Sequence, residues 1–314
     1  MRILHLIYSL NVGGAERMVI TLANYQVQSN QVGLCIINNL YSQKLLNELD
    51  SRIQVFRINR KKASRNILDV FQLNRYVFKF RPDILHIHDS DAILYIPIRS
   101  FYHTILTIHA MNLPLKGYKL YNQTVAISKA VADNTENRGL CRPEVIYNGI
   151  STSAIQRTKK NIPNAEQNFR IVQVGRLEHG IKGQHLILKA LHRLSSSHIS
   201  IDFIGDGSSY NYLKEVTRQL KLEKQVNFLG NCDIEWIYHH LCDYHLLVQP
   251  SISEGFGLTI AEGMAAEVPV LVSDLPAPLE IIDKGKQGYY FRHNDVDDLC
   301  RMLRYIIKHY EEAL

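Results

Sequence analysis

Short apolar runs alternate with helically periodic segments along nearly the whole of this 314-residue chain. A run such as VPVLVS at 268–273 is apolar almost without interruption, which is typical of a strand buried on both faces of a parallel sheet. A segment long enough for a helix follows most of these runs, so the repeating unit is β-α-β. One hydrophobic core seldom grows beyond about 250 to 300 residues. The sequence therefore predicts an α/β protein with two doubly wound parallel-sheet domains and a helix at the C-terminal end.

The predicted elements form two series separated by a polar stretch. The first has strands at 2–10, 32–40, 53–58, 83–88, 103–109, 124–127 and 144–147, with helices near 14–29, 66–81 and 128–138. The second has strands at 169–174, 199–204, 226–229, 245–249, 269–273 and 288–291, with helices near 183–195, 208–220, 233–242, 258–266 and 296–310. Between them, STSAIQRTKKNIPNAEQN shows neither period, which indicates a linker. We predict domains at 1–155 and 166–314.

The charge is distributed unevenly between the two halves. Residues 1–150 hold 18 Lys and Arg against 10 Asp and Glu, whereas residues 151–314 hold 18 against 20. Five cations crowd into residues 57–65, a pattern that suits either an anionic membrane surface or a solvated face. No apolar stretch reaches the roughly 18 residues of a spanning helix, so any membrane contact is expected to be peripheral.

The cysteines indicate a reducing compartment. There are five, they are scattered, and no C-x-x-C pair occurs among them. The first 14 residues have one early cation and no small-residue cleavage site, so they are interpreted as a first strand and not a signal peptide. A cytoplasmic protein is expected, with peripheral contact at the inner face of the membrane as the extension of that expectation.

The most informative segment is HLLVQPSISEGFGLTIAEGMAAEVPVLVSD, residues 245–274. A buried strand is predicted to end at Pro250, and a helix to begin near Leu258. Gly255 and Gly257 permit a tight turn between them. The backbone N–H groups of Leu258 and Thr259 at the helix start have no partner inside the helix, so they can receive a diphosphate.

Two carboxylates, Glu254 and Glu262, stand eight residues apart on either side of this turn and can face one ligand. Taken singly, either is explained as well by a solvated charge or by a charge that complements the positive helix end. Together with Gly255, Phe256 and Gly257 they form a pattern that resembles the E-x7-E signature of family 4 retaining glycosyltransferases. The resemblance implies the GT-B fold, in which two Rossmann-like domains face one another across a cleft.

Further stretches carry the same resemblance over nearly the whole chain. VGRLEHGIKG resembles the family's G-R-L-x-x-x-K-G and assigns Arg176 and Lys182, at the head of the next helix, to the diphosphate, where cations offset developing charge. LNVGGAER resembles the glycine turn that the family places beneath the donor, which assigns Gly13 and Gly14 to it. TIHA matches the family's T-x-H-D at His109, the residue expected to touch the donor sugar. A buried histidine satisfied at a strand end is the alternative for His109.

Other motifs suggest metals but are better explained otherwise. Asp89-Ser90-Asp91 spells D-x-D, yet it lies between a strand and a helical run, where capping of a helix accounts for it. A cluster of possible zinc ligands has unsuitable spacing; it comprises Cys232, His239, His240, Cys242 and His245. We expect no metal and no other cofactor beyond the nucleotide-sugar co-substrate.

The resemblance implies a retaining, metal-independent glycosyltransferase of the hexosyltransferase type. Its expected partners are a nucleotide-sugar donor, with UDP favoured because the family uses it most often, and a glycan or lipid-linked acceptor, as in the assembly of bacterial surface polysaccharide. His109, Arg176, Lys182 and Glu254 would be the catalytic residues, and nucleic acid is not an expected partner. Two alternatives remain open: a nucleotide-sugar epimerase of similar fold, and a non-catalytic nucleotide-sugar-binding protein.

Overall fold

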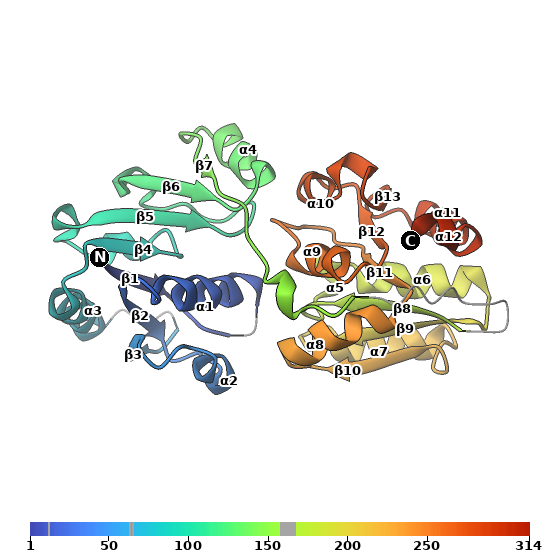
Figure 1. The fold of residues 1–314 in the computed structure, drawn as a ribbon. Coiled ribbons are helices and arrows are strands. Elements are labelled where there is room, and N and C mark those ends of the chain that lie inside the picture. Colours follow the sequence, from blue (N-terminus) through green and yellow to red (C-terminus); the bar gives the residue numbers. More distant parts are fainter. Residues whose placement is uncertain (12, 63, 65, 158–167) are drawn as a thin grey trace. The chain divides into compact units, whose positions relative to one another are not determined.

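The computed structural model describes residues 1–11, 13–62, 64, 66–157 and 168–314, and the chain divides into two units, Met1–Asn148 and Gly149–Leu314. Each unit is a parallel sheet with helices on both faces (Figure 1). The predicted class, two Rossmann-like doubly wound domains, is confirmed. Residues 158–167, which contain most of the predicted linker, lie outside the described residues.

The first unit is built on a seven-stranded sheet in the order β3-β2-β1-β4-β5-β6-β7. Its strands are β1 (Arg2–Ile7), β2 (Gln31–Asn38), β3 (Gln54–Arg60), β4 (Ile84–Ile87), β5 (His103–Ile108), β6 (Gln123–Ala126) and β7 (Glu144–Val145). Its α-helices are α1 (Gly14–Gln26), α2 (Gln43–Asn47), α3 (Ile67–Phe80) and α4 (Lys129–Asn137), and short 3-10 turns lie at Ala92–Tyr95, Arg99–Phe101 and Tyr118–Leu120.

Alternation along the strands divides the first unit's core into two layers. On β1, Leu4 and Leu6 pack with Leu73 and Val77 of α3 on one face. Ile7 packs with helix α1 on the other face. Because both faces are covered, β1 and β2 are apolar almost throughout, the pattern from which the sequence predicts them.

The second unit is built on a six-stranded sheet in the order β10-β9-β8-β11-β12-β13. Its strands are β8 (Phe169–Val174), β9 (Ile199–Ile204), β10 (Val226–Gly230), β11 (Leu246–Gln249), β12 (Val270–Ser273) and β13 (Tyr289–Phe291). Its α-helices are α5 (His179–Lys182), α6 (Gln184–Leu194), α7 (Tyr210–Gln219), α8 (Ile234–His240), α9 (Leu258–Ala265), α10 (Pro276–Ile281), α11 (Val296–Lys308) and α12 (Tyr310–Ala313). Short 3-10 turns lie at Thr152–Ala154, Leu241–Asp243 and Asp283–Gly285.

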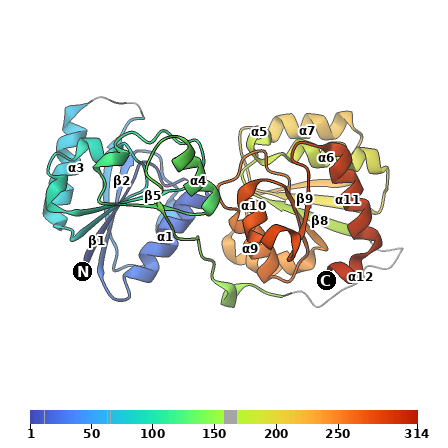
Figure 2. The ribbon, with the colours of Figure 1, turned by 90° about the horizontal axis from the view of Figure 1, so that it is seen from above.

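The second sheet is also covered on both faces. One layer holds buried residues of α6, α7 and α11, and the other holds those of α8 and α9. In Figure 2, α6 and α7 lie on one side of this sheet and α9 on the other. The predicted helix at 296–310 ends at Lys308, and α12 follows as a separate turn whose Tyr310 packs edge-on against Phe169.

Candidate functional site

The order of strands reverses direction beside the first strand of each sheet. β1 lies between β2 and β4 in the first unit, and β8 lies between β9 and β11 in the second. Chains leaving such a pair of strands diverge to opposite faces, and the opening between them is where doubly wound sheets bind ligands. Ligand binding is therefore expected at the loops after β1 and β4 and at the loops after β8 and β11.

The second unit brings Lys182 and Glu254 together at this edge. Lys182 Nζ lies 2.7 Å from Glu254 Oε2, with side chains 23% and 11% exposed. Ser251 Oγ donates a second hydrogen bond to the same carboxylate oxygen at 3.2 Å. An ion pair that is partly shielded from water is held more firmly than a surface pair, so these two side chains are preorganised before any ligand arrives.

Backbone contacts hold the two loops of this edge against one another. The carbonyl of Ile181 accepts from Ile252 N at 2.8 Å and Ser253 N at 3.2 Å. Gly183, with φ of 70°, lies so near the other loop that an added Cβ would stand 1.9 Å from the Pro250 carbonyl oxygen. Only glycine fits there, because the left-handed backbone and the contact both exclude a side chain.

Lys182 ends the one-turn helix α5, and helix α6 begins two residues later, at Gln184. The sequence places Lys182 instead at the head of a helix over 183–195. The difference arises because a four-residue helix containing Gly180 is too short to show a helical period.

Arg176 lies on the loop directly after β8. Its guanidinium is 3.3 Å from Glu178, and its carbonyl accepts from Gln184 Nε2 at 2.9 Å. Gly205, which follows β9 at φ 134°, closes on this loop so tightly that a Cβ would stand 2.1 Å from the Gly175 oxygen. The Arg176 backbone is thus fixed by two neighbouring elements.

The glycine turn before α9 is present as expected. Gly257 caps the helix with φ of 110°, and α9 begins at Leu258 and continues through Thr259. Phe256 is buried, and Glu262 is also buried, in the second turn of the helix. The first backbone N–H groups of α9 have no intrahelical carbonyl to bind, as at any helix start.

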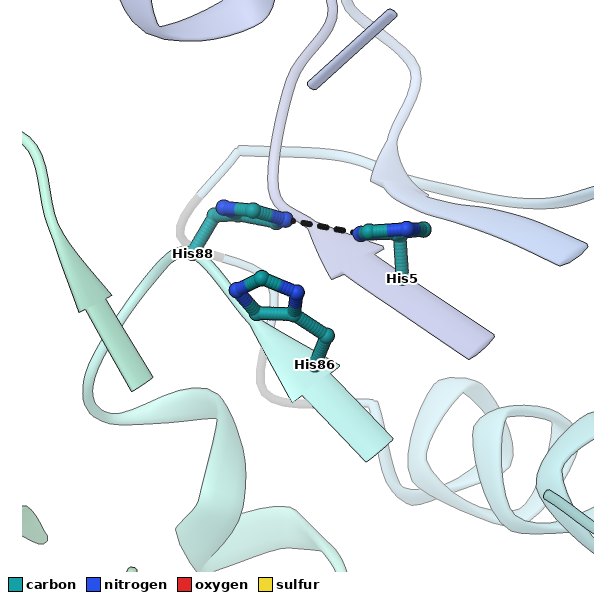
Figure 3. Close-up of side chains that lie close together, drawn as sticks. All are labelled: His5, His86 and His88. Carbon is teal, nitrogen blue, oxygen red and sulfur yellow. Dashed lines mark hydrogen bonds between the residues drawn. The ribbon is translucent and has the colours of Figure 1, made fainter. Parts of the chain in front are cut away.

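The edge of the first unit carries histidines in place of an ion pair. His5 on β1, His86 on β4 and His88 just after β4 are buried together, and Figure 3 shows the His5 and His88 rings facing one another with His86 beside them. His5 Nδ1 lies 3.1 Å from His88 Nε2, and His88 Nδ1 lies 2.9 Å from His109 Nε2. The predicted donor contact His109 is therefore tied into a chain of rings.

Burial keeps these imidazoles neutral. Loss of hydration lowers the pKa of His5 to about 4, against a smaller opposing effect of its hydrogen bond with Gln26, and lowers the pKa of His109 to about 4. The same cause holds the pKa of His86 and of His88 well below the usual histidine range. At neutral pH the four histidine rings of this edge are therefore polar but uncharged.

Asp89 and Asp91 follow His88, and the structure corrects the capping interpretation of this tripeptide. Asp91 precedes a 3-10 turn but makes no side-chain cap, whereas Asp89 Oδ2 accepts from Tyr8 N at 2.6 Å. Capping fails because Asp89 is turned back toward β1. Burial raises the pKa of Asp89 to about 6.

A pocket of about 260 Å³ lies beside these residues, lined by 88–91, 106–108 and 113–116. A larger, more open hollow of about 620 Å³ lies around Met1, Arg2 and residues 27–31, at the amino ends of β1 and β2. The smaller one is the better candidate for ligand binding, because it lies at the carboxyl edge of the sheet.

Within the described part of the chain, one group of three residues offers metal-ligand atoms near one another: nitrogens of His5, His86 and His88, within 4.8 Å. His5 and His88 already share a hydrogen bond. In the second unit, two of the possible zinc ligands make other contacts. His245 Nδ1 accepts from Arg170 N at 2.9 Å, and His240 lies 2.7 Å from Asp243.

Gly13 and Gly14 form the start of α1. Gly13 is its N-cap with an extended backbone, φ −175° and ψ 165°, which any residue adopts, and Gly14 is the first helical residue. The backbone conformation at Gly13 thus gives no reason for glycine there.

The sequence analysis missed His5, His86 and His88. His86 and His88 stand two apart on a strand, which places them on one face, and that spacing was a visible signal. His5 pairs with His86 in the β1·β4 register, a neighbour that appears only once the order of strands is known.

Two Rossmann-like parallel-sheet domains define the architectural class, which is that of GT-B glycosyltransferases. The model for "Glycosyl transferases group 1" matches residues 154–313, and that for "Glycosyltransferase Family 4" matches residues 12–154. The chain belongs to this glycosyltransferase family.

Relatives agree with that placement. An uncharacterised glycosyltransferase of Methanocaldococcus jannaschii is 27% identical over 62% of this chain and 52% of its own. A lipopolysaccharide 1,6-galactosyltransferase of Salmonella typhimurium is 25% identical over 58% of this chain and 52% of its own. The match thus spans about half the length of these two curated relatives. The structure of Anabaena HepE in complex with UDP and glucose has a TM-score of 0.83 at 22% identity, covering 100% of this chain and 91% of that one.

The described helices include none that joins the length and the apolar character needed to cross a bilayer.

Proposed function

We propose that this protein transfers a sugar from a nucleotide-sugar donor to an acceptor hydroxyl, with retention of anomeric configuration and without a metal ion. The observation that carries the proposal is the Lys182–Glu254 ion pair, shielded at the carboxyl edge of the second sheet. The family and the structural likeness to a protein crystallised with UDP and glucose support it. A UDP-sugar is the donor we favour.

The donor diphosphate is assigned to the cations and the helix start. Backbone N–H groups of Leu258 and Thr259 meet phosphate oxygens at the positive end of α9, with Gly255, Phe256 and Gly257 shaping the turn. Lys182 and Arg176 offset the charge that grows on the departing diphosphate.

The two acids bind hydroxyl groups of the donor. Glu254 takes those of the sugar and Glu262 those of the ribose. Because Glu254 already pairs with Lys182, phosphate binding at Lys182 would draw the cation between two anions and leave the second oxygen of Glu254 for a hydroxyl.

The first unit contributes His109 to the sugar and the Gly13–Gly14 turn to the donor. In the transfer, the bond from the anomeric carbon to phosphate breaks as the bond to the acceptor oxygen forms on the same face. The acceptor proton passes to the departing phosphate oxygen, so no side chain acts as nucleophile. A neutral His109 suits contact with the donor sugar, because a cation there would oppose the positive charge that develops on the sugar.

The acceptor is proposed to be a glycan or a lipid-linked sugar of a surface polysaccharide. The Salmonella galactosyltransferase that acts on lipopolysaccharide supports that class. The pocket lined by 88–91, 106–108 and 113–116 is the place proposed for it, because its loops follow β4 and β5.

A lipid-linked acceptor requires approach to a membrane, and α3 has a surface suited to it. Its exposed stripe holds Ile67, Leu68, Phe71 and Phe78, of which Phe71 is 69% and Phe78 61% exposed. Exposed Lys61 and Lys62 precede the helix, and Arg75 and Lys79 lie along it. An apolar stripe flanked by cations is typical of peripheral binding to anionic lipid.

Flotation with vesicles tests the membrane proposal. Wild-type protein should float with vesicles containing anionic lipid and not with purely zwitterionic ones, and Phe71→Asp with Phe78→Asp should abolish flotation. Tyr25→Asp, on α1 and 80% exposed, is the control and should float like wild type. The proposal is contradicted if flotation is the same with anionic and zwitterionic vesicles and the same for wild type and the double phenylalanine variant.

A panel assay tests the transfer itself. One nucleotide sugar, expected to carry UDP, should raise the melting temperature, because a ligand that binds only the folded state stabilises it. That donor should then yield nucleoside diphosphate and a product with the donor's anomeric configuration when a glycan acceptor is added. Conversion of the donor sugar without an acceptor would identify an epimerase, and binding with neither transfer nor hydrolysis a non-catalytic binder.

A further inference from the structure

Four side chains in the first unit form one continuous hydrogen-bonded chain. Gln26 Oε1, at the end of α1, lies 2.8 Å from His5 Nε2. His5 Nδ1 then lies 3.1 Å from His88 Nε2, and His88 Nδ1 lies 2.9 Å from His109 Nε2. The chain ends at His109 Nδ1, a buried atom with no hydrogen-bond partner among the described residues.

The proton count along this chain allows two arrangements. A neutral imidazole has one N–H donor and one acceptor nitrogen. His5 and His88 each use both ring nitrogens in the chain, and His109 uses Nε2 alone. Because every hydrogen bond needs one donor and one acceptor, the position of the proton on one ring fixes its position on the others. Either every Nε2 carries the proton, or every Nδ1 does.

The two ends of the chain favour the first arrangement. The amide of Gln26 is oriented with its oxygen toward His5, and because an oxygen only accepts, this orientation assigns the donor role to His5 Nε2. His88 Nε2 then donates to His5, and His109 Nε2 donates to His88. The reverse arrangement would leave His109 Nδ1–H as a buried donor without an acceptor, which proteins tolerate worse than a spare lone pair.

We propose that Gln26, His5 and His88 are positioning residues that keep the ring proton of His109 on Nε2 and leave Nδ1, which is buried in this structure, as the acceptor for a hydroxyl group that reaches it when the ligand binds. The tautomer itself follows from the first unit alone, whereas its use on a sugar hydroxyl rests on the proposed function. The burial that keeps all three rings neutral is what makes a chain of single protons possible.

His86 provides a matched control inside the same cluster. Its ring stacks on His88 with centroids 4.5 Å apart (Figure 3). Its Nε2 bonds Thr107 Oγ1 at 2.8 Å and takes no part in the chain. A change at His86 should disturb packing as much as a change at His88 and leave the proton of His109 where it is.

Ring ¹⁵N NMR of histidine-labelled protein at pH 7.5 tests the tautomer. His109 should be protonated at Nε2 and bare at Nδ1 in the wild type. His88→Met should give a mixture of both forms, while His88→Asn should keep the wild-type pattern, because its amide oxygen accepts where Nδ1 did. His86→Met should leave His109 unchanged. A proton on His109 Nδ1 in the wild type overturns the proposal, and that spectrum decides even where a variant fails to fold.

Steady-state kinetics test the consequence. His88→Met should lower kcat for transfer about tenfold, His88→Asn should recover it to within about twofold, and His86→Met should retain it. Equal losses in all three variants would reduce His88 to a packing residue. A wild-type protein with the expected tautomer but no transfer would refute the proposed function and leave the tautomer assignment standing.

Discussion

The carboxyl edges of the two sheets occupy equivalent places in one topology, yet their chemistry is opposite. The first sheet presents neutral histidines, of which His5 and His88 are buried and joined by a hydrogen bond. The second presents a Lys182–Glu254 ion pair that retains partial contact with water. The topology thus fixes where a ligand can bind, while the residues after each strand decide whether the edge meets it with hydrogen bonds or with charge.

In the proposed function, this difference corresponds to the two parts of a nucleotide sugar, its diphosphate and its sugar. A diphosphate needs cations and oriented N–H groups, which the second edge has. A sugar close to losing its leaving group needs directional hydrogen bonds without added positive charge, which the first edge has.

The largest effect is expected at Lys182. Lys182→Ala should lower kcat tenfold to a thousandfold, the range for removing one preorganised charge from the leaving group. Lys189→Ala, which removes an exposed cation on the next helix, is the control and should keep wild-type turnover. Equal turnover in wild type and Lys182→Ala would exclude Lys182 from the reaction.

The second effect concerns acid. Because the folded pKa values of His5 and His109 are about 4 and an unfolded histidine titrates near 6.5, the stability they contribute is complete above pH 6.5 and falls as pH drops toward 4. Between pH 7.5 and pH 5, the lowered pKa of each of these two histidines reduces the free energy of unfolding by about 2 kcal/mol. Asp89, whose pKa is raised to about 6, increases the free energy of unfolding by about 1 kcal/mol over the same interval.

Hydrogen exchange, corrected for the intrinsic effect of pH, should therefore show β1 and β4 opening more readily at pH 5 than at pH 7.5. The change should exceed that in β8 and β11, because burial lowers the pKa of four histidines in the first unit and of two, His185 and His245, in the second. A larger change in the second sheet would contradict the assignment of neutral histidines to the first.

The third effect concerns the second edge's backbone. Gly183→Ala should destabilise by about 2 kcal/mol more than Gly139→Ala, measured by urea unfolding. Both glycines have left-handed φ values, 70° and 78°, but only at Gly183 would the Cβ meet a carbonyl, and Gly139 has nothing within 4 Å. Similar losses at both sites would show that the close approach of the Pro250 loop is dispensable.

The smallest effect is expected from metals. Treatment with EDTA should leave transfer unchanged, and added Zn²⁺ should leave the melting temperature unchanged. A zinc-dependent rise that disappears in His86→Met would instead turn the three-histidine group into a metal site.

Most of the fold could be predicted because buried parallel strands leave continuous apolar runs. The bounds of β8 and β9 agree with the prediction to the residue. Short helices could not be predicted, because α2, α5 and α10 have four to six residues, too few for a helical period in the sequence. For α5, the geometry depends on contact with a loop far along the chain, through the pairing of Ile181 with Ile252.

For the candidate site, too, the sequence predicts some of the residues but not the contacts between them. Glu254 and Lys182 were predicted through motif likeness, and the structure brings them together. Their direct pairing was not foreseen, because 72 residues separate them. The partners of His109 were missed for the same reason: His5 lies 83 residues from His88, and only the order of strands makes them neighbours.

The proposed function places the diphosphate of a nucleotide sugar at the second edge. A crystal structure of the protein soaked with UDP-sugar tests it most directly. We predict phosphate oxygens within hydrogen-bonding distance of Lys182 Nζ and of the backbone N–H groups of Leu258 and Thr259. A nucleotide found elsewhere, with the Lys182–Glu254 edge empty, would contradict the account.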